Sequence, residues 1–495
     1  MSNTATIQGA EQTWMGHPRG LMTLFFTELW ERFSYYGMRG ILVLFLVDAM
    51  RGGFAMNTVT AAAIYGLYTS LVYLVAMPGG WIADNLMGQR NAIFAGGIVI
   101  ACGHFSMAIP TTYTFYQGLI LIIIGTGLLK PNVSAIVGGL YPEGGARCDA
   151  GFSIFYMGIN IGALCGPLIC GYLGENVNWH YGFGAAGVGM VLGLIQYRLG
   201  YKYFHTVGVK RHEDVQERNK ALRKLFYAIG IVLAIIVILG ILRTTALKFT
   251  IHQFARGLGY CVIALAILYF SLILFFGKLE HTEKKRVLVI FFLFIGAALF
   301  WSGFEQAGSS MNLFAERFTN RTILGWLMPA SWLQSVNPVF IIALAPVFGW
   351  LWVALASKMR EPSIPIKFFF GLLLLGVGFL VMAWASLYAA KGGPGVNPAW
   401  LVATYFMHTL GELCLSPVGL SSVTKLAPKR LVSQMMGTWF MGAALGNLIA
   451  GLVAGQFETL PLPKLFLTVA IFAAGTGFLF LIFSKPIKNL IGGKV

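Results

Sequence analysis

Long apolar runs that lack charged residues recur along the whole chain of 495 residues, and they constrain its fold more than any other feature. Charged residues make up only 11% of the sequence, whereas soluble domains contain roughly 25%. The polar surface that soluble domains of this total length need is therefore missing. A helix of about 20 apolar residues is long enough to cross a bilayer. The sequence predicts a polytopic membrane protein and excludes soluble, secreted, disordered and fibrous classes.

Fourteen runs are predicted to cross the bilayer, the first at Leu21–Ala49 and the last at Leu462–Phe483. The 35 Lys and Arg residues gather between these runs, mostly in the loops on one side. Because positive loops stay in the cytoplasm, we expect both termini to be cytoplasmic. The same distribution explains the net charge of +17 without nucleic acid, which we exclude as a partner. The six cysteines form no C-x-x-C pair, so no metal site is expected.

The runs fall into a pattern of six, two and six, because the polar residues of interest occur only in the outer groups of six. Two six-helix halves around a central site are typical of the major facilitator fold. We predict an all-α membrane protein with two bundles and two extra helices between them. The expected parts are a cytoplasmic segment at 1–19, an N-terminal bundle at 20–204, linkers with a two-helix hairpin at 205–286, and a C-terminal bundle at 287–495. We expect the hairpin to face lipid.

Ionisable side chains inside membrane spans cost roughly 2.5–3.5 kcal/mol each on insertion scales, so each one is a functional hypothesis. Glu28, Glu31 and Arg32 lie at i, i+3 and i+4, which places them on one helix face and lets Glu28 pair with Arg32. Lys130 of the fourth span is the expected partner of the remaining carboxylate. A carboxylate that gains and loses a basic partner can carry a proton. The alternative is a static network that holds the two spans together.

One end of the predicted site is cationic and the other is anionic. Arg39 presents a planar guanidinium that fits a carboxylate. In the second half, the buried charges are Glu305 and Glu412, and the spans of that half supply no base. A zwitterionic solute fits this arrangement. Further candidates are phenol hydroxyls around the guanidinium, amides that accept from an ammonium group, and two indoles. The indoles either cap side-chain pockets or lie at the membrane interface or against lipid. These candidates are Tyr35, Tyr36, Tyr68, Asn160, Asn337, Trp301 and Trp439.

Motifs of soluble enzymes are missing from the sequence. The run Gly125–Pro131 contains a Gly-rich stretch and a lysine, but no Ser or Thr follows the lysine as a P-loop requires. We therefore expect no cofactor, and an ion gradient rather than ATP as the energy source. A membrane-embedded enzyme is an alternative, although His104 and Glu305 belong to different halves and are therefore poorly placed to form a catalytic pair. No catalytic residue is assigned.

Four stretches resemble the proton-coupled oligopeptide transporters. Glu28–Gly37 fits the family signature E-x-x-E-R-F-x-Y-Y-G, and three further stretches agree: Gly127–Asn132 (G-L-L-K-P-N), Phe152–Gly162 (F-S-I-F-Y-M-G-I-N-I-G) and Gly411–Pro417 (G-E-L-C-L-S-P). Phe300-Trp301 with Glu305-Gln306 is also similar to the seventh core helix of the family. The two extra spans are similar to those of bacterial members.

This resemblance implies symport of di- and tripeptides with protons across a bacterial inner membrane, by a protein expected to be monomeric. It implies a coupling network of Glu28, Glu31, Arg32 and Lys130. It places the peptide carboxylate at Arg39, Lys130, Tyr35 and Tyr68, the amino end at Asn160, Asn337 and Glu412, and a proton site at Glu305. The second span lacks the histidine of animal members, so coupling must depend on carboxylates. Another small solute, such as nitrate, remains an alternative substrate.

Overall fold

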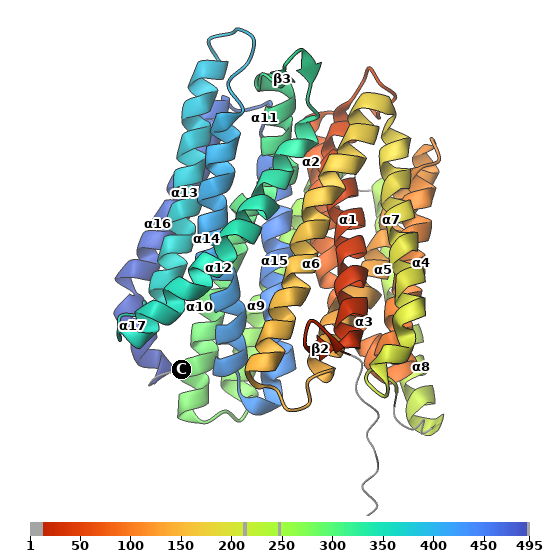
Figure 1. The fold of residues 1–495 in the computed structure, drawn as a ribbon, viewed down its shortest axis with the longest axis vertical. Coiled ribbons are helices and arrows are strands. Elements are labelled where there is room, and N and C mark those ends of the chain that lie inside the picture. Colours follow the sequence, from red (N-terminus) through yellow and green to blue (C-terminus); the bar gives the residue numbers. More distant parts are fainter. Residues whose placement is uncertain (1–12, 211–214, 246–248, 493–495) are drawn as a thin grey trace, which may run out of the picture. The chain divides into compact units, whose positions relative to one another are not determined.

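The computed structural model describes residues 13–210, 215–245 and 249–492 (Figure 1). The earlier part of the chain forms α1 Arg19–Val47, α2 Thr58–Leu74, α3 Ala76–Ile82, η1 Ala83–Met87, α4 Gln89–Met107, α5 Thr112–Gly139, α6 Gly145–Tyr172, η2 Leu173–Val177, α7 Trp179–Gly200 and η3 Tyr201–Phe204. The later part forms α8 Val215–Thr245, α9 Ile251–Phe276, α10 His281–Phe304, η4 Glu305–Gly308, α11 Ser310–Phe318, η5 Ala330–Ser335, α12 Val336–Ser357, α13 Ile364–Ala389, α14 Ala399–Leu426, η6 Lys429–Leu431, α15 Val432–Ala454, α16 Leu462–Ile482 and α17 Ser484–Ile491.

Two short antiparallel hairpins accompany these helices. One pairs β1 Thr13–Trp14 with β2 His17–Pro18, and the other pairs β3 Thr322–Ile323 with β4 Trp326–Leu327. Each strand has only two residues, so the fold depends on helix packing. The predicted all-α class is confirmed.

Ten helical segments within the described residues are long and apolar enough to cross a membrane. Four more of the predicted runs form α1, α4, α7 and α14, with 29, 19, 22 and 28 residues. These are long enough to span a bilayer but are less apolar or more charged, and α1 alone carries Glu28, Glu31, Arg32 and Arg39. Together the described helices occupy all fourteen predicted runs. That the last four cross the membrane stays a prediction.

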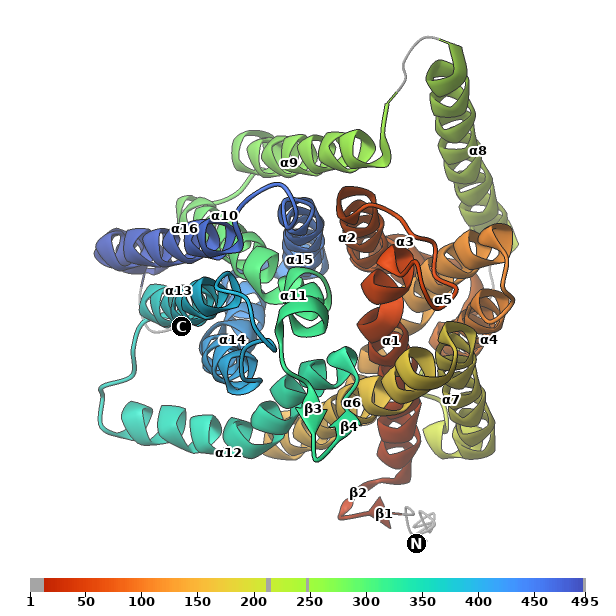
Figure 2. The same cartoon turned by 90° about the horizontal axis from the view of Figure 1, so that it is seen from above.

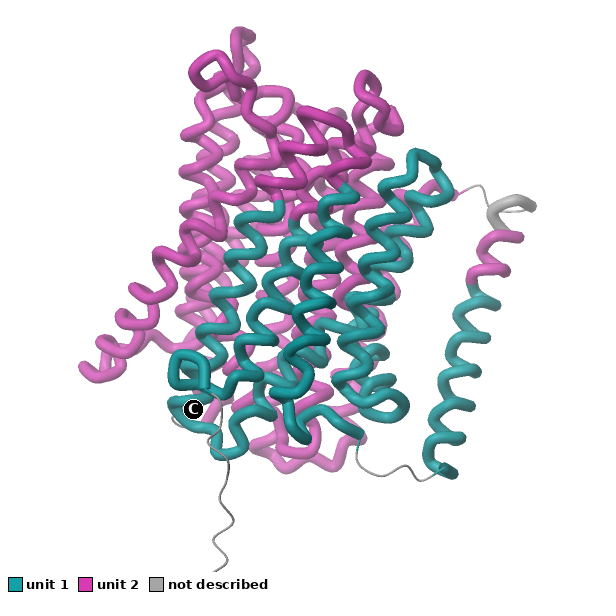
Figure 3. The backbone as a smooth tube through the Cα atoms, turned by 45° about the vertical axis from the view of Figure 1, so that its right-hand side comes forward, with its two compact units in different colours: residues 1–36, 75–166, 183–235 teal, residues 37–74, 167–182, 236–495 magenta. Residues whose placement is uncertain are grey.

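The chain divides into two compact units (Figure 3). Unit 1 consists of residues 1–36, 75–166 and 183–235, and unit 2 consists of residues 37–74, 167–182 and 236–495. The boundary between them divides α1, so that its first part belongs to unit 1 and its last part to unit 2. These compact units are defined by contacts and are not the two six-helix bundles predicted from the sequence. The predicted bundle boundaries therefore stay predictions.

Unit 1 is held together by close backbone contact between α4 and α5. A Cβ atom added at Gly96 would lie 2.6 Å from the carbonyl oxygen of Gly125, and one added at Gly103 would lie 2.8 Å from that of Gly118. Glycine is therefore required where the two backbones touch, as is common between membrane helices. Beside this contact lies an apolar core built from α1, α4, α5, α6 and α7, which includes Leu21, Ile93, Leu129, Phe155 and Met190.

Unit 2 contains α13 with α14 and α16 packed along it, and a tight contact between α2 and α15 (Figures 1 and 2). At this contact, a Cβ atom added at Gly451 would lie 2.6 Å from both the Gly66 Cα atom and the Ala62 carbonyl oxygen. The two helices thus meet backbone to backbone.

The predicted hairpin consists of α8 and α9. The apolar window of α8 has no buried residue, as expected for a helix surface that faces lipid. In unit 2, α9 lies beside α2 and α15 (Figure 2), where Ala255 packs with Ala63 and Leu448. At the other end of α9, Arg430 donates to the carbonyl oxygens of Gly277 and Lys278 at 2.9 and 2.8 Å. The helix is therefore fixed to the rest of unit 2 at both ends.

The α2–α15 contact predicts that Gly451→Val destabilises the protein. The valine side chain would collide with backbone atoms that cannot rotate away, and overpacking of this kind costs about 1–3 kcal/mol. The measurement is the midpoint of thermal unfolding in detergent. Gly475→Val is the matched control, because Gly475 in α16 has open space where a Cβ atom would lie. Equal midpoints for both variants would contradict the close approach.

Candidate functional site

A cluster of buried charges lies on α1 within unit 1. Arg32 Nε lies 2.8 Å from Glu28 Oε1 and 2.7 Å from Glu31 Oε2, and all three side chains are buried. The predicted Glu28–Arg32 pair is therefore confirmed. Lys130 of α5 interacts electrostatically with Glu31, as predicted for the second carboxylate. We call these four residues the α1 charge cluster. It has two acids and two bases, which limits the cost of burying each charge.

Other predicted residues of unit 1 lie near this cluster or on α6. The rings of Tyr35 and Tyr36 meet edge to face at 5.2 Å, and the Arg32 guanidinium lies 5.7 Å from the centre of the Tyr35 ring. On α6, the buried Asn160 donates its amide hydrogen to the Tyr156 carbonyl oxygen at 2.9 Å. That bond involves the NH₂ group of Asn160. The side-chain oxygen of Asn160 is an acceptor, which is what an ammonium group needs.

Unit 2 contains a buried ion pair that the sequence did not predict. Arg39 Nη1 donates to Glu305 Oε2 at 2.7 Å, and both residues are at most 5% exposed. The guanidinium comes from the last part of α1, whereas Glu305 begins η4, a break between α10 and α11. The sequence predicted no base in the spans of 287–495, and the partner of Glu305 indeed lies far away in the chain. The prediction is nevertheless wrong for α13, which begins earlier than expected and contains the buried Lys367, paired with Glu361 at 2.6 Å.

A second polar group of unit 2 joins α12 to α14. The Asn337 amide nitrogen donates to Thr409 Oγ1 at 2.9 Å and to Glu412 Oε2 at 3.2 Å. The Thr409 hydroxyl donates in turn to the Tyr405 carbonyl oxygen at 2.7 Å. The Glu412 and Glu305 carboxylates are near enough to repel each other when both are charged. The structure therefore brings the predicted Asn337 and Glu412 together, and adds Thr409, which sequence analysis missed.

The remaining predicted residues are aromatic and lie in unit 2. Tyr68 of α2 is buried. Trp439 is only 5% exposed, and its ring occupies the space where a Cβ atom at Gly419 would lie, 2.1 Å away. The lipid-facing alternative for Trp439 is therefore wrong, because α14 covers the indole. Trp301 is half-buried and its ring lies 5.3 Å from that of Phe304.

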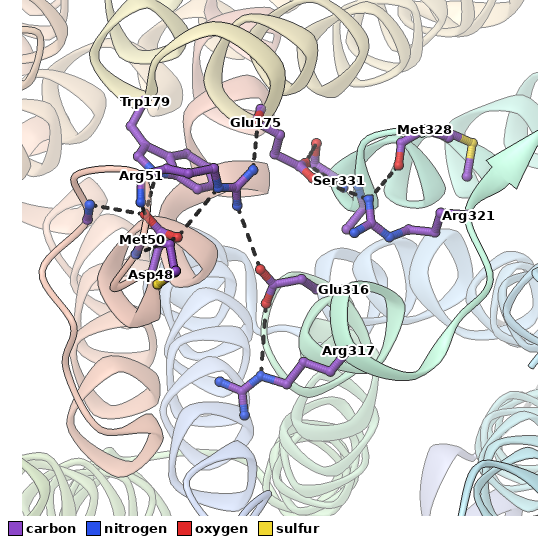
Figure 4. Close-up of polar contacts among 12 residues, drawn as sticks. Asp48, Met50, Arg51, Glu175, Trp179, Glu316, Arg317, Arg321, Met328 and Ser331 are labelled. Atoms are coloured by element: carbon purple, nitrogen blue, oxygen red, sulfur yellow. Dashed lines mark hydrogen bonds and ion pairs between the residues drawn. The ribbon is translucent and has the colours of Figure 1, made fainter. Parts of the chain in front are cut away.

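A network of residues from loops and the helix ends beside them in unit 2 was also not predicted, and we call it the loop network: Asp48, Arg51, Glu175, Trp179, Glu316, Arg317, Arg321, Met328 and Ser331 (Figure 4). Buried Glu175 accepts from the backbone nitrogens of Ala330 and Ser331 at 2.6 and 2.9 Å, and from the Ser331 hydroxyl at 2.5 Å. It therefore satisfies the first donors of η5, which a helix leaves without partners in its own turn.

Asp48 is the centre of the other part of the loop network. Its carboxylate accepts from Trp179 Nε1 at 3.0 Å and from the backbone nitrogens of Arg51 and Gly53 at 2.9 and 3.1 Å (Figure 4). Arg51 also reaches the Glu175 carbonyl oxygen at 2.7 Å and Glu316 at 3.8 Å. Asp48 lies near the end of the predicted run Leu21–Ala49, and the sequence predicted no partner for it. Its partners follow in a tight loop and in α7, a pattern that spacing alone does not reveal.

Two surface cavities, of about 530 and 360 Å³, contain none of the predicted site residues. The larger is lined by the end of α11 and by the α13–α14 connection, and the smaller by η1 and the segment after η3. Neither is a candidate for the site described above. Among the described residues, no group of His, Cys, Asp or Glu could hold a metal ion.

Glu412 of α14 lies in the part of the chain that a family model matches, whereas the buried charges of α1 precede that part. The family model described as the POT family matches residues 90–468. This chain belongs to the POT family. The resemblance found in the sequence is therefore confirmed, and the POT family is a family of transporters.

Relatives of this POT protein match it along almost its whole length. It is 40% identical to the peptide transporter YePEPT of Yersinia enterocolitica, with 99% of this chain and 98% of the relative covered. It is 38% identical to the di-/tripeptide transporter of Lactococcus lactis subsp. cremoris, with coverage of 97% and 98%. A crystal structure of a peptide transporter POT in complex with sulfate matches with a TM-score of 0.89 at 41% identity, covering 98% of both chains.

The loop network predicts how the stability of this POT protein depends on pH. Burial raises the pKa of Asp48, but bonds from Trp179 and the backbone of Arg51 and Gly53 outweigh it and lower the pKa. A lowered folded pKa stabilises the protein above the unfolded value of about 4, and this contribution is lost as the pH falls through the folded pKa. Asp48→Asn should therefore lower the unfolding midpoint at pH 7, and the difference from wild type should shrink in acid.

The measurement is thermal unfolding in detergent at a series of pH values. Asp149→Asn, at an exposed aspartate in α6, is the control and should leave the midpoint nearly unchanged. A difference for Asp48→Asn that stays constant down to pH 3 would mean that its charge does not contribute.

Proposed function

We propose that this chain is a secondary active transporter that carries di- and tripeptides into the cell together with protons, by alternating access of the site to the two sides of the membrane. The names of the relatives from Yersinia and Lactococcus support the peptide substrate. A match to a POT variant in complex with alafosfalin, with a TM-score of 0.87, supports it further. The observation that carries the mechanism is the buried Arg39–Glu305 pair.

This ion pair couples a proton to a peptide carboxylate by competition for one guanidinium. A proton that binds Glu305 removes its charge and leaves Arg39 as a buried cation without an anionic partner, which is costly. The peptide carboxylate restores the pair, since it offers the same two oxygens to the guanidinium. Protonation of Glu305 therefore favours peptide binding, and peptide binding favours protonation by the same factor.

The amino end of the peptide is assigned to Asn337 and Glu412, which together offer a carboxylate and an amide to an ammonium group. An extended dipeptide separates its terminal charges by about 6–7 Å. The α1 charge cluster, with two carboxylates around one Arg32 side chain, is the proposed second proton-handling group. We propose that Tyr35, Tyr36, Tyr68, Asn160, Trp301 and Trp439 complete the peptide site.

We further propose that the protein resides in a bacterial inner membrane as a monomer with both termini in the cytoplasm, and that the proton is its coupling ion. The distribution of Lys and Arg between the apolar runs supports this orientation. Residues 1–19, 20–204, 205–286 and 287–495 are the proposed cytoplasmic segment, N-terminal bundle, hairpin region and C-terminal bundle.

Uptake by proteoliposomes tests the function. Labelled dialanine should accumulate inside above its outside concentration when the outside is more acidic, and a protonophore should abolish the accumulation. Nitrate at equal concentration should not compete. Competition by nitrate, or accumulation that survives the protonophore, would favour another solute or another coupling ion.

Glu305→Gln isolates the coupling step, because glutamine keeps the size of the protonated acid but cannot exchange a proton. We expect gradient-driven accumulation of dialanine to be lost while exchange of labelled for unlabelled peptide continues. Glu143→Gln, at an exposed glutamate, is the control and should transport normally. Uphill accumulation by Glu305→Gln would show that another carboxylate carries the proton.

Arg39→Ala tests the carboxylate site when it is made in the Glu305→Gln background, where no buried acid is left unpaired. Affinity for free dialanine should fall by about tenfold or more, the size of one charge-assisted hydrogen bond. Dialanine amide, which has no carboxylate, should bind weakly before and after the change. Competition against a labelled dipeptide gives both affinities, and an equal loss for the two ligands would make Arg39 a structural residue.

A further inference from the structure

Thr409 occupies a special position between α12 and α14 in unit 2. Its side chain is fully buried, whereas Asn337 and Glu412, which it adjoins, are only partly buried. A threonine hydroxyl has one hydrogen to donate and lone pairs to accept with. Thr409 donates its hydrogen to the Tyr405 carbonyl oxygen at 2.7 Å, a bond within its own helix. Towards Asn337, 2.9 Å away, the hydroxyl can therefore act only as an acceptor.

The acceptor role of the Thr409 hydroxyl fixes the orientation of the Asn337 amide. An asparagine side chain can rotate by about 180° and exchange its oxygen and nitrogen at little cost in shape. Because the Thr409 hydroxyl can only accept here, the Asn337 amide makes a hydrogen bond only when its NH₂ group faces the hydroxyl. The reverse orientation would place the amide oxygen against the hydroxyl oxygen. The Glu412 carboxylate at 3.2 Å favours the same orientation. The amide oxygen is then the atom left to accept from other groups.

The two neighbours of Asn337 differ in one respect. A carboxylate that takes up a proton becomes a donor as well as an acceptor, so a protonated Glu412 can bond either end of the amide and no longer selects one orientation. The Thr409 hydroxyl carries no charge and its hydrogen is held by the Tyr405 carbonyl. Its effect on Asn337 is therefore independent of the charge state of Glu412.

We propose that Thr409 is a positioning residue, which locks the Asn337 amide so that its oxygen accepts from the peptide ammonium group whether or not Glu412 is charged. This rests on the proposed function, because it assigns Thr409 to the amino-end site of a peptide transporter. Thr409 does not touch the peptide and acts only through Asn337.

Thr409→Val tests the lock, because valine has nearly the same shape and removes the hydroxyl. Affinity for free dialanine should fall about three- to tenfold, which is the net contribution of one ordinary hydrogen bond between uncharged groups. Affinity for N-propionylalanine, which lacks the ammonium group, should not change. Thr409→Ser keeps the hydroxyl and should restore wild-type binding. An unchanged affinity for dialanine in Thr409→Val would overturn the proposal.

Thr404→Val is the matched control. Thr404 is also fully buried in α14 and its hydroxyl also bonds the carbonyl oxygen four residues earlier, that of Trp400, at 2.9 Å. It should not change the ratio of affinities for dialanine and N-propionylalanine. A loss equal to that of Thr409→Val would mean that any buried hydroxyl of this helix has the effect.

A double-mutant cycle separates this proposal from the proposed function. Thr409→Val should have no further effect on dialanine affinity when Asn337 is already alanine. Without peptide, the two changes should also lower the unfolding midpoint by less together than the sum of their single effects. If wild type binds dialanine and N-propionylalanine equally, the amino-end assignment fails and the role of Thr409 in it fails too. Additive midpoints would instead disprove the Thr409–Asn337 bond itself.

Discussion

The organisation of this protein depends on the cost of placing charge inside apolar helices. The structure meets this cost by pairing: Arg32 contacts two glutamates, Arg39 contacts Glu305, and Lys130 interacts with Glu31. Each pair is stable only while both partners are charged. A proton that binds one of these acids removes its charge and leaves the paired base without an anionic partner. The same ion pairing that lowers the cost of burial therefore makes the buried charges respond to protons.

Much of the fold follows from the sequence, because a long apolar run in a membrane has few alternatives to a helix. The fourteen predicted runs all lie on described helices, and the E-x-x-E-R spacing placed Glu28 beside Arg32 correctly. Such contacts are local, and helical geometry fixes them within one turn. The family followed from stretches of sequence in the same local way.

The interactions that the sequence did not reveal join residues far apart in the chain. Arg39 and Glu305 are separated by 266 positions, and the amide of Asn337 reaches Thr409 across 72. The sequence around a hydroxyl or a buried acid does not indicate which distant residue is its partner. The sequence analysis assigned Glu175 no role, yet it accepts from three donors of η5. Tertiary packing selects these partners, and only coordinates supply them.

The backbone contact between α2 and α15 has a mechanical consequence. Where Gly66 meets Gly451, no side chain separates the two backbones, so at this point movement of one helix against the other need not change any side-chain rotamer. Dispersion attraction between backbone atoms stabilises a contact of this kind. It is lost over a small displacement, because dispersion forces fall steeply with distance. The glycine contact can therefore form again in the same place without a side chain having to recover its rotamer, whereas Ala63 and Leu448 beside it must pack together again.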